Sequence, residues 1–406
     1  MAEHTSTLRI LSIVEATTIN AVAKSVLGFF RSARELNQQS VDFPVIDGSF
    51  ATFERRREDD HSPNEFVTAA RESGFQIDVI PERRRFDLSV IPALRKIVED
   101  RQPDIVVTNS VKSHFLLWRS RLWKDFPWIA FHHGYTDTDR KMRVYNRLDR
   151  WSLPRADRLV TVCRVFAQEL SSTTGVPLER ISVQHNSIRP QPRPSADEVQ
   201  ALKERLGIAN GERMILAVGR LSKEKAHIDL LVAFKRLRET NPEINCKLII
   251  VGDGPERGKL EAVVESFDLK ESVIFTGQVR DVQTSYAVAD AFALPSHSEG
   301  SPNVLLEAMA ANLAVVATKV GGVPEIVVDS ESALLVAAND PPALASAITR
   351  LLTDSELARR LTINASALAI TKHSPEQYVR SLVEIYREVI DRRMTKRSSS
   401  QSLVQQ

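Results

Sequence analysis

The sequence predicts an α/β protein with two doubly wound, Rossmann-like domains. Three observations support this prediction: the chain has 406 residues, short apolar runs alternate with amphipathic segments in both halves, and a proline-rich stretch separates the halves. A length of about three times the commonest domain size fits two domains. Strand, helix and strand repeating at this pitch indicate parallel sheets that helices cover on both faces.

The expected strands are short runs rich in β-branched residues. In the first half they are Leu8–Val14, Gln76–Ile80, Asp104–Thr108, Trp128–His132, Arg158–Val162 and Ile181–Gln184. Helical patterns lie between several of them, at Ala21–Leu36, Asn64–Ser73 and Asp87–Asp100. In the second half the expected strands are Arg213–Val218, Lys247–Val251, Val273–Thr276, Ala291–Leu294, Val315–Ala317 and Ala333–Val336.

Prolines on alternate positions mark the boundary between the halves. Pro190, Pro192 and Pro194 exclude a helix and disfavour a central strand, which predicts an extended linker over 189–197. We therefore place an N-terminal domain at 1–188 and a C-terminal domain at 198–391, with the option that the last helix packs back on the N-terminal domain. The polar tail 392–406 is expected to be disordered.

Composition excludes several classes of protein. Lys and Arg number 54 against 52 Asp and Glu, a net charge of +2 that gives no reason to expect a nucleic-acid binder. Cys163 and Cys246 lie in apolar stretches and are interpreted as buried free thiols. The sequence has no apolar run of the ~18–20 residues that a membrane span needs, and its start lacks a secretory pattern. These features predict a cytoplasmic protein.

The most informative segment follows the expected strand at Ala291–Leu294. We expect Ser301 to cap a helix whose first residue is Pro302, so that the amides of Asn303 and Val304 can bind a phosphate. A capped crossover helix without a ligand gives the same pattern. Glu307, on an otherwise apolar helix, needs hydrogen-bond donors, which a ribose diol would supply. Glu299 precedes it by eight positions and is either a ligand-binding acid or a solvated loop acid.

Two further loops carry groups that suit a phosphate-containing ligand. Arg220 and Lys225 follow a strand and Gly219, and a guanidinium beside an ammonium suits a pyrophosphate, although a solvated surface run is the alternative. Gly252 begins a glycine turn that we interpret as a wall of the same pocket. The spacing of that turn does not match a dinucleotide fingerprint, and no such fingerprint follows an early strand, which argues against an oxidoreductase.

In this order, the motifs GRLSKEK, VGDGPERGKLE, FTGQV, EGSPNVLLE and GGVPEIV resemble those of the retaining nucleotide-sugar glycosyltransferases of family 4, which have the GT-B fold. The resemblance is detailed over about residues 213–353. It implies that the N-terminal domain binds the acceptor and the C-terminal domain binds a nucleoside diphosphate sugar across a cleft.

The resemblance also implies roles for single residues. Arg220 and Lys225 would bind the diphosphate and Glu307 the ribose hydroxyls, while His133 and Glu299 would orient the transferred sugar. The remaining implied donor contacts are the backbone of Gly300, Ser301, Asn303 and Val304, together with Val279 and Arg280 against the base. His133, Glu299, Arg220 and Lys225 form the implied catalytic set, and Asn186 lies near the domain junction.

The sequence departs from the family pattern at three places. Ala226 replaces the glycine that usually follows the phosphate-binding lysine, and Ser187 stands where glycine is common. The glycine-rich turn after the first strand is replaced by residues 16–20, where hydroxyls of Thr17 or Thr18 would substitute for backbone amides.

The implied reaction transfers a sugar with retention and needs neither a metal nor a cofactor. Asp137 and Asp139 have the D-x-D spacing of metal-dependent transferases of another fold and are interpreted here as surface acids. The alternatives are a nucleotide-sugar epimerase or hydrolase of the same architecture and a non-catalytic sugar-nucleotide sensor. For the acceptor we expect a polysaccharide, lipopolysaccharide or lipid-linked molecule in cell-envelope synthesis.

A basic stretch of the N-terminal half bears on the acceptor. Residues 101–190 hold 15 Lys and Arg against 8 Asp and Glu, and the segment Ser113–Lys124 combines cations with aromatic residues at helical spacing. Such a helix can lie on an anionic membrane surface, which would make the protein peripheral on the cytoplasmic membrane face. A helix that faces the core and has a solvated basic edge fits the pattern equally well.

Overall fold

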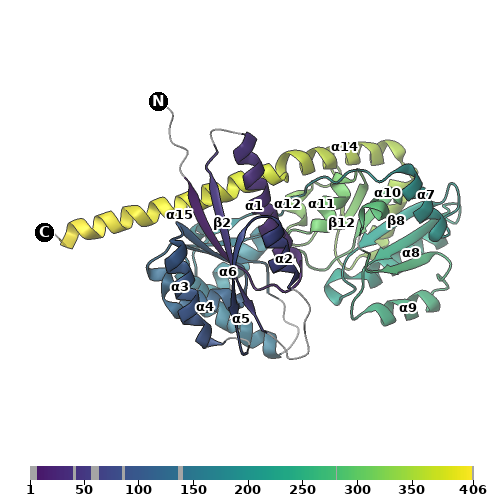
Figure 1. Ribbon diagram of the computed structural model, residues 1–406. Helices are drawn as coiled ribbons and strands as arrows, with labels where there is room; N and C mark the ends of the chain where they lie inside the picture. The colour runs from purple at the N-terminus through teal and green to yellow at the C-terminus, as the bar shows by residue number, and fades with distance from the viewer. Residues whose placement is uncertain are drawn as a thin grey trace. The chain divides into compact units, whose positions relative to one another are not determined.

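A computed structural model describes residues 7–39, 43–55, 64–84, 87–135, 140–279 and 281–404, without the side chains of 140–141 and 397–404 (Figure 1). The chain forms two compact units. Unit 1 comprises residues 1–184 and 375–406, and unit 2 comprises residues 185–374. Each unit has its own parallel sheet, as the alternating pattern of the sequence predicts.

In the described part of unit 1, seven parallel strands form a sheet in the order β3-β2-β1-β4-β5-β6-β7. Their bounds are β1 Leu8–Ile13, β2 Ile46–Glu54, β3 Gln76–Pro81, β4 Ile105–Thr108, β5 Trp128–His132, β6 Arg158–Thr161 and β7 Ile181–Val183. The order in which the chain adds strands to the sheet reverses between β1 and β4. This is the topological switch point at which doubly wound sheets bind ligands.

Strand β2 is absent from the expectations drawn from the sequence. Its first half is polar and contains Gly48, so it lacks the apolar run that marks a buried strand. The structure explains the glycine, because a Cβ at position 48 would lie 2.2 Å from Cδ1 of Phe30. The Phe30 ring therefore packs directly on the strand backbone.

Helices cover both faces of the unit 1 sheet. They are α1 Ala21–Gln39, α2 Glu65–Glu72, α3 Ile91–Arg101, α4 Val111–Ser120, α5 Arg140–Ser152, α6 Arg164–Thr174 and α15 Pro375–Val404. Alternate residues of β1 serve opposite faces: Ile10 joins the core with α1, α2 and α15, and Leu11 joins the core with α3, α4 and α6.

Helix α15 passes alongside α1 in Figure 1 and buries one face against unit 1. Tyr378, Leu382 and Tyr386 belong to the same core as α1. Arg393 donates to Asp157 Oδ2 at 2.6 Å and to the carbonyl of Trp123 at 2.7 Å. The structure therefore differs from the expected disordered tail, since the chain is helical from Arg392 through Val404.

In the described part of unit 2, six parallel strands form a sheet in the order β10-β9-β8-β11-β12-β13. The strands are β8 Arg213–Val218, β9 Cys246–Val251, β10 Val273–Gly277, β11 Ala291–Leu294, β12 Ala314–Thr318 and β13 Leu334–Val336. The helices are α7 Ala196–Arg205, α8 His227–Thr240, α9 Arg257–Ser266, α10 Gln283–Val288, α11 Asn303–Ala310, α12 Val323–Ile326, α13 Pro341–Thr353 and α14 Ser355–Lys372. Residues 184–195, which include the alternating prolines, form neither helix nor strand.

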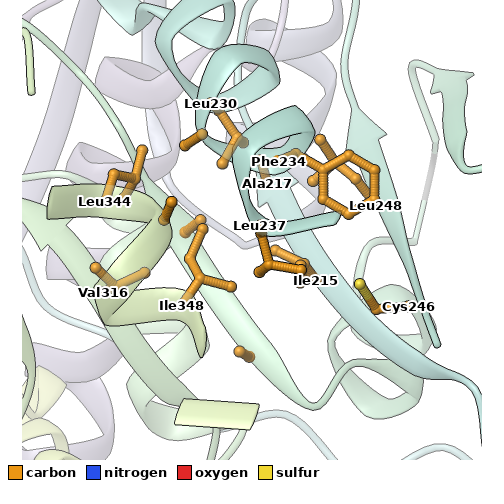
Figure 2. Close-up of a cluster of buried hydrophobic side chains, with 14 of the residues drawn as sticks. Ile215, Ala217, Leu230, Phe234, Leu237, Cys246, Leu248, Val316, Leu344 and Ile348 are labelled. Carbon is orange, nitrogen blue, oxygen red and sulfur yellow. The ribbon is translucent and has the colours of Figure 1, made fainter. Parts of the chain in front are cut away.

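Figure 2 shows one core of unit 2, where Phe234 of α8 and Ile348 of α13 pack over the strands. Cys246 lies in this core and is fully buried, as the apolar context of the sequence predicts. Burial raises the pKa of its thiol to about 11, so the thiol stays protonated and inert. The core fixes the strands whose carboxyl ends carry the loops of the site.

Candidate functional site

An open pocket lies at the carboxyl ends of β8, β9 and β10 in unit 2. Arg220, Gly252 and Val279, which the sequence assigned to donor binding, all line this pocket. Parallel strands that end at one edge bring together loops distant in the sequence. Arg280, the other residue assigned to the base, lies outside the described residues.

Glycines let the loops of this pocket approach each other. Gly252 has φ +139°, and a Cβ there would lie 1.9 Å from the carbonyl oxygen of Gly219. Gly254 makes a similar approach, because its Cβ would lie 2.4 Å from the carbonyl oxygen of Leu221. The Gly252 amide donates to the carbonyl of Gly277 at 2.9 Å. The three loops therefore form one interlocked wall.

Lys225 and Glu299 form an ion pair in unit 2. Lys225 Nζ lies 2.7 Å from Glu299 Oε1, and the Ser296 hydroxyl donates to the same oxygen at 2.6 Å. The Glu299 side chain is 5% exposed and the Lys225 side chain 25% exposed. The solvated alternative for Glu299 is therefore wrong, because this carboxylate is buried and its Oε1 is paired with Lys225 and Ser296.

The backbone of Glu299 is also held. A Cβ at Gly321, which has φ +51°, would lie 1.7 Å from the Glu299 carbonyl oxygen, and the Gly322 amide donates to that oxygen at 3.2 Å. The glycine pair of the motif GGVPEIV thus supports the loop that carries Glu299. Gly300, Ser301 and Asn303 continue this loop into α11.

The start of α11 differs from the expectation. The helix begins at Asn303, with Pro302 (φ −69°, ψ 114°) as its N-cap, and Ser301 makes no capping hydrogen bond. Ser301 is engaged elsewhere: its hydroxyl accepts from the Asn186 amide at 2.8 Å, and its carbonyl accepts from Asn186 Nδ2 at 2.8 Å. The first-turn amides of Asn303 and Val304 have no intrahelical acceptor, which leaves them available to a ligand.

Glu307 has a donor that the sequence analysis missed. The Tyr286 hydroxyl donates to Glu307 Oε2 at 2.8 Å, and Tyr286 is fully buried on α10. Burial and the neighbouring carboxylate hold the pKa of Tyr286 well above its usual value. Nothing in the sequence distinguishes this tyrosine from an ordinary core aromatic residue.

Glu307 lies in a different pocket from Arg220. It lines a pocket together with Tyr286, Asn312 and the proline-rich segment 189–194. The described structure therefore brings Arg220, Gly252 and Val279 together in one pocket, and it places Glu307 at the wall of another.

In unit 1, the predicted residues lie in loops after β1 and β5. Thr17 and Thr18 are exposed, and their carbonyls accept from the amides of Glu65 and Asn20. His133 is exposed and lies nearly parallel to the Phe131 ring, with 6.3 Å between the ring centroids. Asp137 and Asp139 fall outside the described residues.

The basic aromatic segment Ser113–Lys124 faces the core. Leu116 and Leu117 of α4 are fully buried, and Phe115, Trp118 and Trp123 pack against the same core. The alternative of a core-facing helix with a basic edge is therefore correct for this segment, and a membrane surface would have to lie elsewhere.

The described residues contain no group of three or more His, Cys, Asp and Glu side chains that could hold a metal ion. No described helix combines the length and apolar character required to cross a bilayer.

Two family models match the chain. The model of the group 1 glycosyl transferases matches residues 198–367, and the model of Glycosyltransferase Family 4 matches residues 30–191. The chain belongs to the group 1 family 4 glycosyltransferases. This membership confirms the family that the motifs of this sequence resemble.

Curated proteins are similar to this chain in sequence, and solved structures are similar to it in fold. N-acetyl-alpha-D-glucosaminyl L-malate synthase of Bacillus anthracis is 28% identical over 60% of this chain and 63% of its own length. Alpha-monoglucosyldiacylglycerol synthase of Acholeplasma laidlawii is 28% identical over 49% of each chain. Anabaena HepE in complex with UDP superposes with a TM-score of 0.78 at 18% identity, covering 94% of this chain and 100% of HepE. The predicted GT-B fold is thereby confirmed.

Proposed function

We propose that this chain is a retaining glycosyltransferase that moves a sugar, of hexosyl type, from a nucleoside diphosphate sugar to an acceptor hydroxyl. The observation that carries the proposal is the open pocket at the strand ends of unit 2, where the Arg220 guanidinium stands beside the glycine wall of Gly252. A solved structure of HepE contains UDP-glucose, which supports a uridine nucleotide as the first donor to test.

The proposed reaction requires groups that stabilise the negative charge of a leaving diphosphate. The bond between the anomeric carbon and the diphosphate oxygen breaks, and negative charge develops on the leaving group. Arg220, Lys225 and the free amides at the start of α11 would stabilise that charge by preorganised electrostatics, without a metal. The acceptor oxygen forms the new bond on the face that the phosphate leaves, and its proton passes to the departing phosphate. No separate base is then required.

Lysines 223 and 225 allow a matched test of donor binding. We expect calorimetry with UDP-, GDP- and ADP-sugars to show one preferred donor, whose affinity falls about tenfold or more in Lys225→Ala because one phosphate contact is lost. Lys223→Ala is the control, since Lys223 lies in the same turn but is exposed. Equal effects of both substitutions, or no binding of any sugar nucleotide, would refute the proposed donor site.

Turnover separates the alternatives. A transferase releases nucleoside diphosphate faster when acceptor is added, a hydrolase gives free sugar without acceptor, an epimerase gives an isomeric sugar, and a sensor binds the donor without turnover. We expect activity to be unchanged by a chelator of divalent cations. Loss of activity on chelation would contradict the metal-independent mechanism.

We further propose that the acceptor belongs to a cell-envelope polysaccharide, lipopolysaccharide or glycolipid, presented at an anionic membrane surface. Helix α5 supports this with two exposed apolar residues two turns apart, Val144 and Trp151, each 59% exposed. Arg143 is exposed beside them, and the guanidinium of Arg147 lies 5.5 Å from the Trp151 ring centroid. Exposed tryptophan flanked by arginines is typical of interfacial helices.

Vesicle co-sedimentation tests this surface. We expect salt-sensitive binding to phosphatidylcholine vesicles that contain phosphatidylglycerol, and weaker binding for Trp151→Ala. Ile370→Ala is the control, because Ile370 is 56% exposed on α14 of unit 2. Absence of binding to anionic vesicles would refute the membrane surface and leave the donor site untouched.

A further inference from the structure

A fully buried carboxylate joins three elements around the His133 loop. Asp149 of α5 is 0% exposed. Its Oδ1 lies 2.6 Å from Nδ1 of His114 on α4, and its Oδ2 accepts from the Tyr135 hydroxyl at 3.1 Å. Nδ1 of His132, at the end of β5, lies 3.4 Å from the same Oδ2.

The carboxylate lies among imidazole groups. Nε2 of His114 lies 3.3 Å from the carbonyl oxygen of Thr108, so the two ring nitrogens of His114 face the Asp149 carboxylate and a backbone acceptor. Burial alone would raise the pKa of Asp149, but the imidazoles of His114 and His132 outweigh burial and bring this pKa below its usual range. Asp149 is therefore ionised and paired.

The cluster holds the backbone on both sides of His133. His132 and Tyr135, which contact Asp149, flank His133 and Gly134, and their rings lie edge to face with 4.2 Å between centroids. Gly134 has φ +97°, and a Cβ there would lie 2.6 Å from Cε2 of Phe166. His133 thus belongs to a segment fixed at each neighbouring residue, while its own side chain is exposed.

We propose that Asp149 is a positioning residue, which clamps the segment 132–135 so that the His133 imidazole is preorganised toward the transferred sugar. This rests on the proposed function, in which His133 orients that sugar. A buried carboxylate is an expensive way to join two helices, because apolar side chains of similar volume do so as well or better. Precise placement of one side chain explains this cost, since a displacement of about 1 Å can lower a rate about a hundredfold.

A double-mutant cycle tests the clamp in the full chain. Tyr135→Phe removes one hydrogen bond to the carboxylate, and we expect kcat to fall about tenfold with a smaller change in the donor KM. Ser152→Ala is the matched control: its buried hydroxyl donates to the Asp149 backbone carbonyl at 3.0 Å, so we expect kcat within about twofold of the parent. In a His133→Ala background, Tyr135→Phe should change kcat by no more than about twofold, because it acts through His133.

Equal losses from Tyr135→Phe in both backgrounds, or an equal loss from Ser152→Ala, would show a merely structural role and overturn the clamp. If His133→Ala leaves transfer unchanged, the proposed role of His133 fails instead. Imidazole NMR of the labelled protein then still tests the clamp, with the His133 signal identified by its loss in His133→Ala. We expect Tyr135→Phe to shift or broaden that signal and Ser152→Ala to leave it unchanged; an unaffected signal in Tyr135→Phe overturns the proposal.

Substitutions of His114, which also contacts the Asp149 carboxylate, provide a second test if the Tyr135→Phe protein does not fold. His114→Asn keeps a donor near Asp149 Oδ1, whereas His114→Ala removes it. The clamp requires a larger loss of kcat and a larger change in the His133 signal for alanine than for asparagine. Equal behaviour of the two variants contradicts it.

Discussion

Lys225 and Glu299 are 74 residues apart in the sequence, yet Lys225 Nζ lies 2.7 Å from Glu299 Oε1. The sequence assigned these residues separate roles, one on the diphosphate and one on the sugar. The structure joins the two side chains in one ion pair. The buried carboxylate, which also accepts a hydrogen bond from Ser296, fixes the orientation of the ammonium. A diphosphate that reaches this lysine would meet a cation whose orientation is already fixed.

This pairing predicts strong coupling between the two positions. Lys225→Met leaves Glu299 buried without its cation and should lower the free energy of unfolding by about 1–3 kcal/mol. Lys225→Met combined with Glu299→Gln should cost less than the sum of the single changes, by about 1 kcal/mol in urea denaturation. Additive effects would show that the ion pair contributes nothing to stability.

Tyr286 tests whether Glu307 binds the donor ribose, as the family resemblance implies, although Glu307 lines a different pocket from Arg220. Tyr286→Phe removes the hydroxyl that donates to Glu307 Oε2, so the carboxylate loses a fixed orientation, and we expect about a three- to tenfold weaker donor Kd. Tyr378→Phe is the control, since Tyr378 is buried in unit 1 and its hydroxyl lies 3.1 Å from that of Ser25. Isothermal calorimetry compares the two. A donor Kd that is unchanged in Tyr286→Phe would separate Glu307 from donor binding.

The glycine wall predicts opposite outcomes for two alanine substitutions. Gly252→Ala places a Cβ 1.9 Å from the Gly219 carbonyl oxygen at φ +139°, so the loops must move, and we expect a loss of more than about 2 kcal/mol together with weaker nucleotide binding. Gly258→Ala, in helix α9 with no atom within 4 Å of the added Cβ, should stabilise by up to about 1 kcal/mol. Thermal and urea unfolding test both, and equal losses would refute the close approach.

His227 makes stability depend on pH. The ring is buried at the start of α8, and its Nδ1 has no hydrogen-bond partner among the described residues. Burial, helped by Lys225, lowers its pKa from 6.5 to about 4. Above pH 6.5 both states are neutral at this site; between 6.5 and 4 only the unfolded state binds the proton. The free energy of unfolding should therefore fall over this window, by up to roughly 3 kcal/mol.

His227→Leu removes this proton uptake. Urea denaturation at pH 7, 6 and 5 should show the stability of the parent falling faster than that of the variant as the pH decreases. Parallel pH profiles would contradict the assignment of the loss to His227.

The sequence could predict the strands and most site loops because parallel, doubly covered strands are continuous apolar runs and ligand loops follow them. It failed where tertiary contacts decide. Strand β2 could not be predicted because it contains Gly48, and the need for a glycine there comes from the Phe30 ring, which packs on the strand only in the folded protein. Ser301 is a residue type that often caps helices, yet its hydroxyl accepts a hydrogen bond from the Asn186 amide instead. The partners of Glu307 and the cluster at Asp149 come from residues 14–35 positions away and look like ordinary core side chains.

Helix α15 has a consequence for biosynthesis. Tyr378, Leu382 and Tyr386 complete the core of unit 1, although almost two hundred residues of unit 2 are translated between β7 and this helix. The inserted unit is continuous and can fold while the ribosome is still elongating. The unit begun first must wait with α1 uncovered until the final helix emerges, so termination between residues 184 and 375 leaves an aromatic surface of α1 exposed to chaperones and proteases.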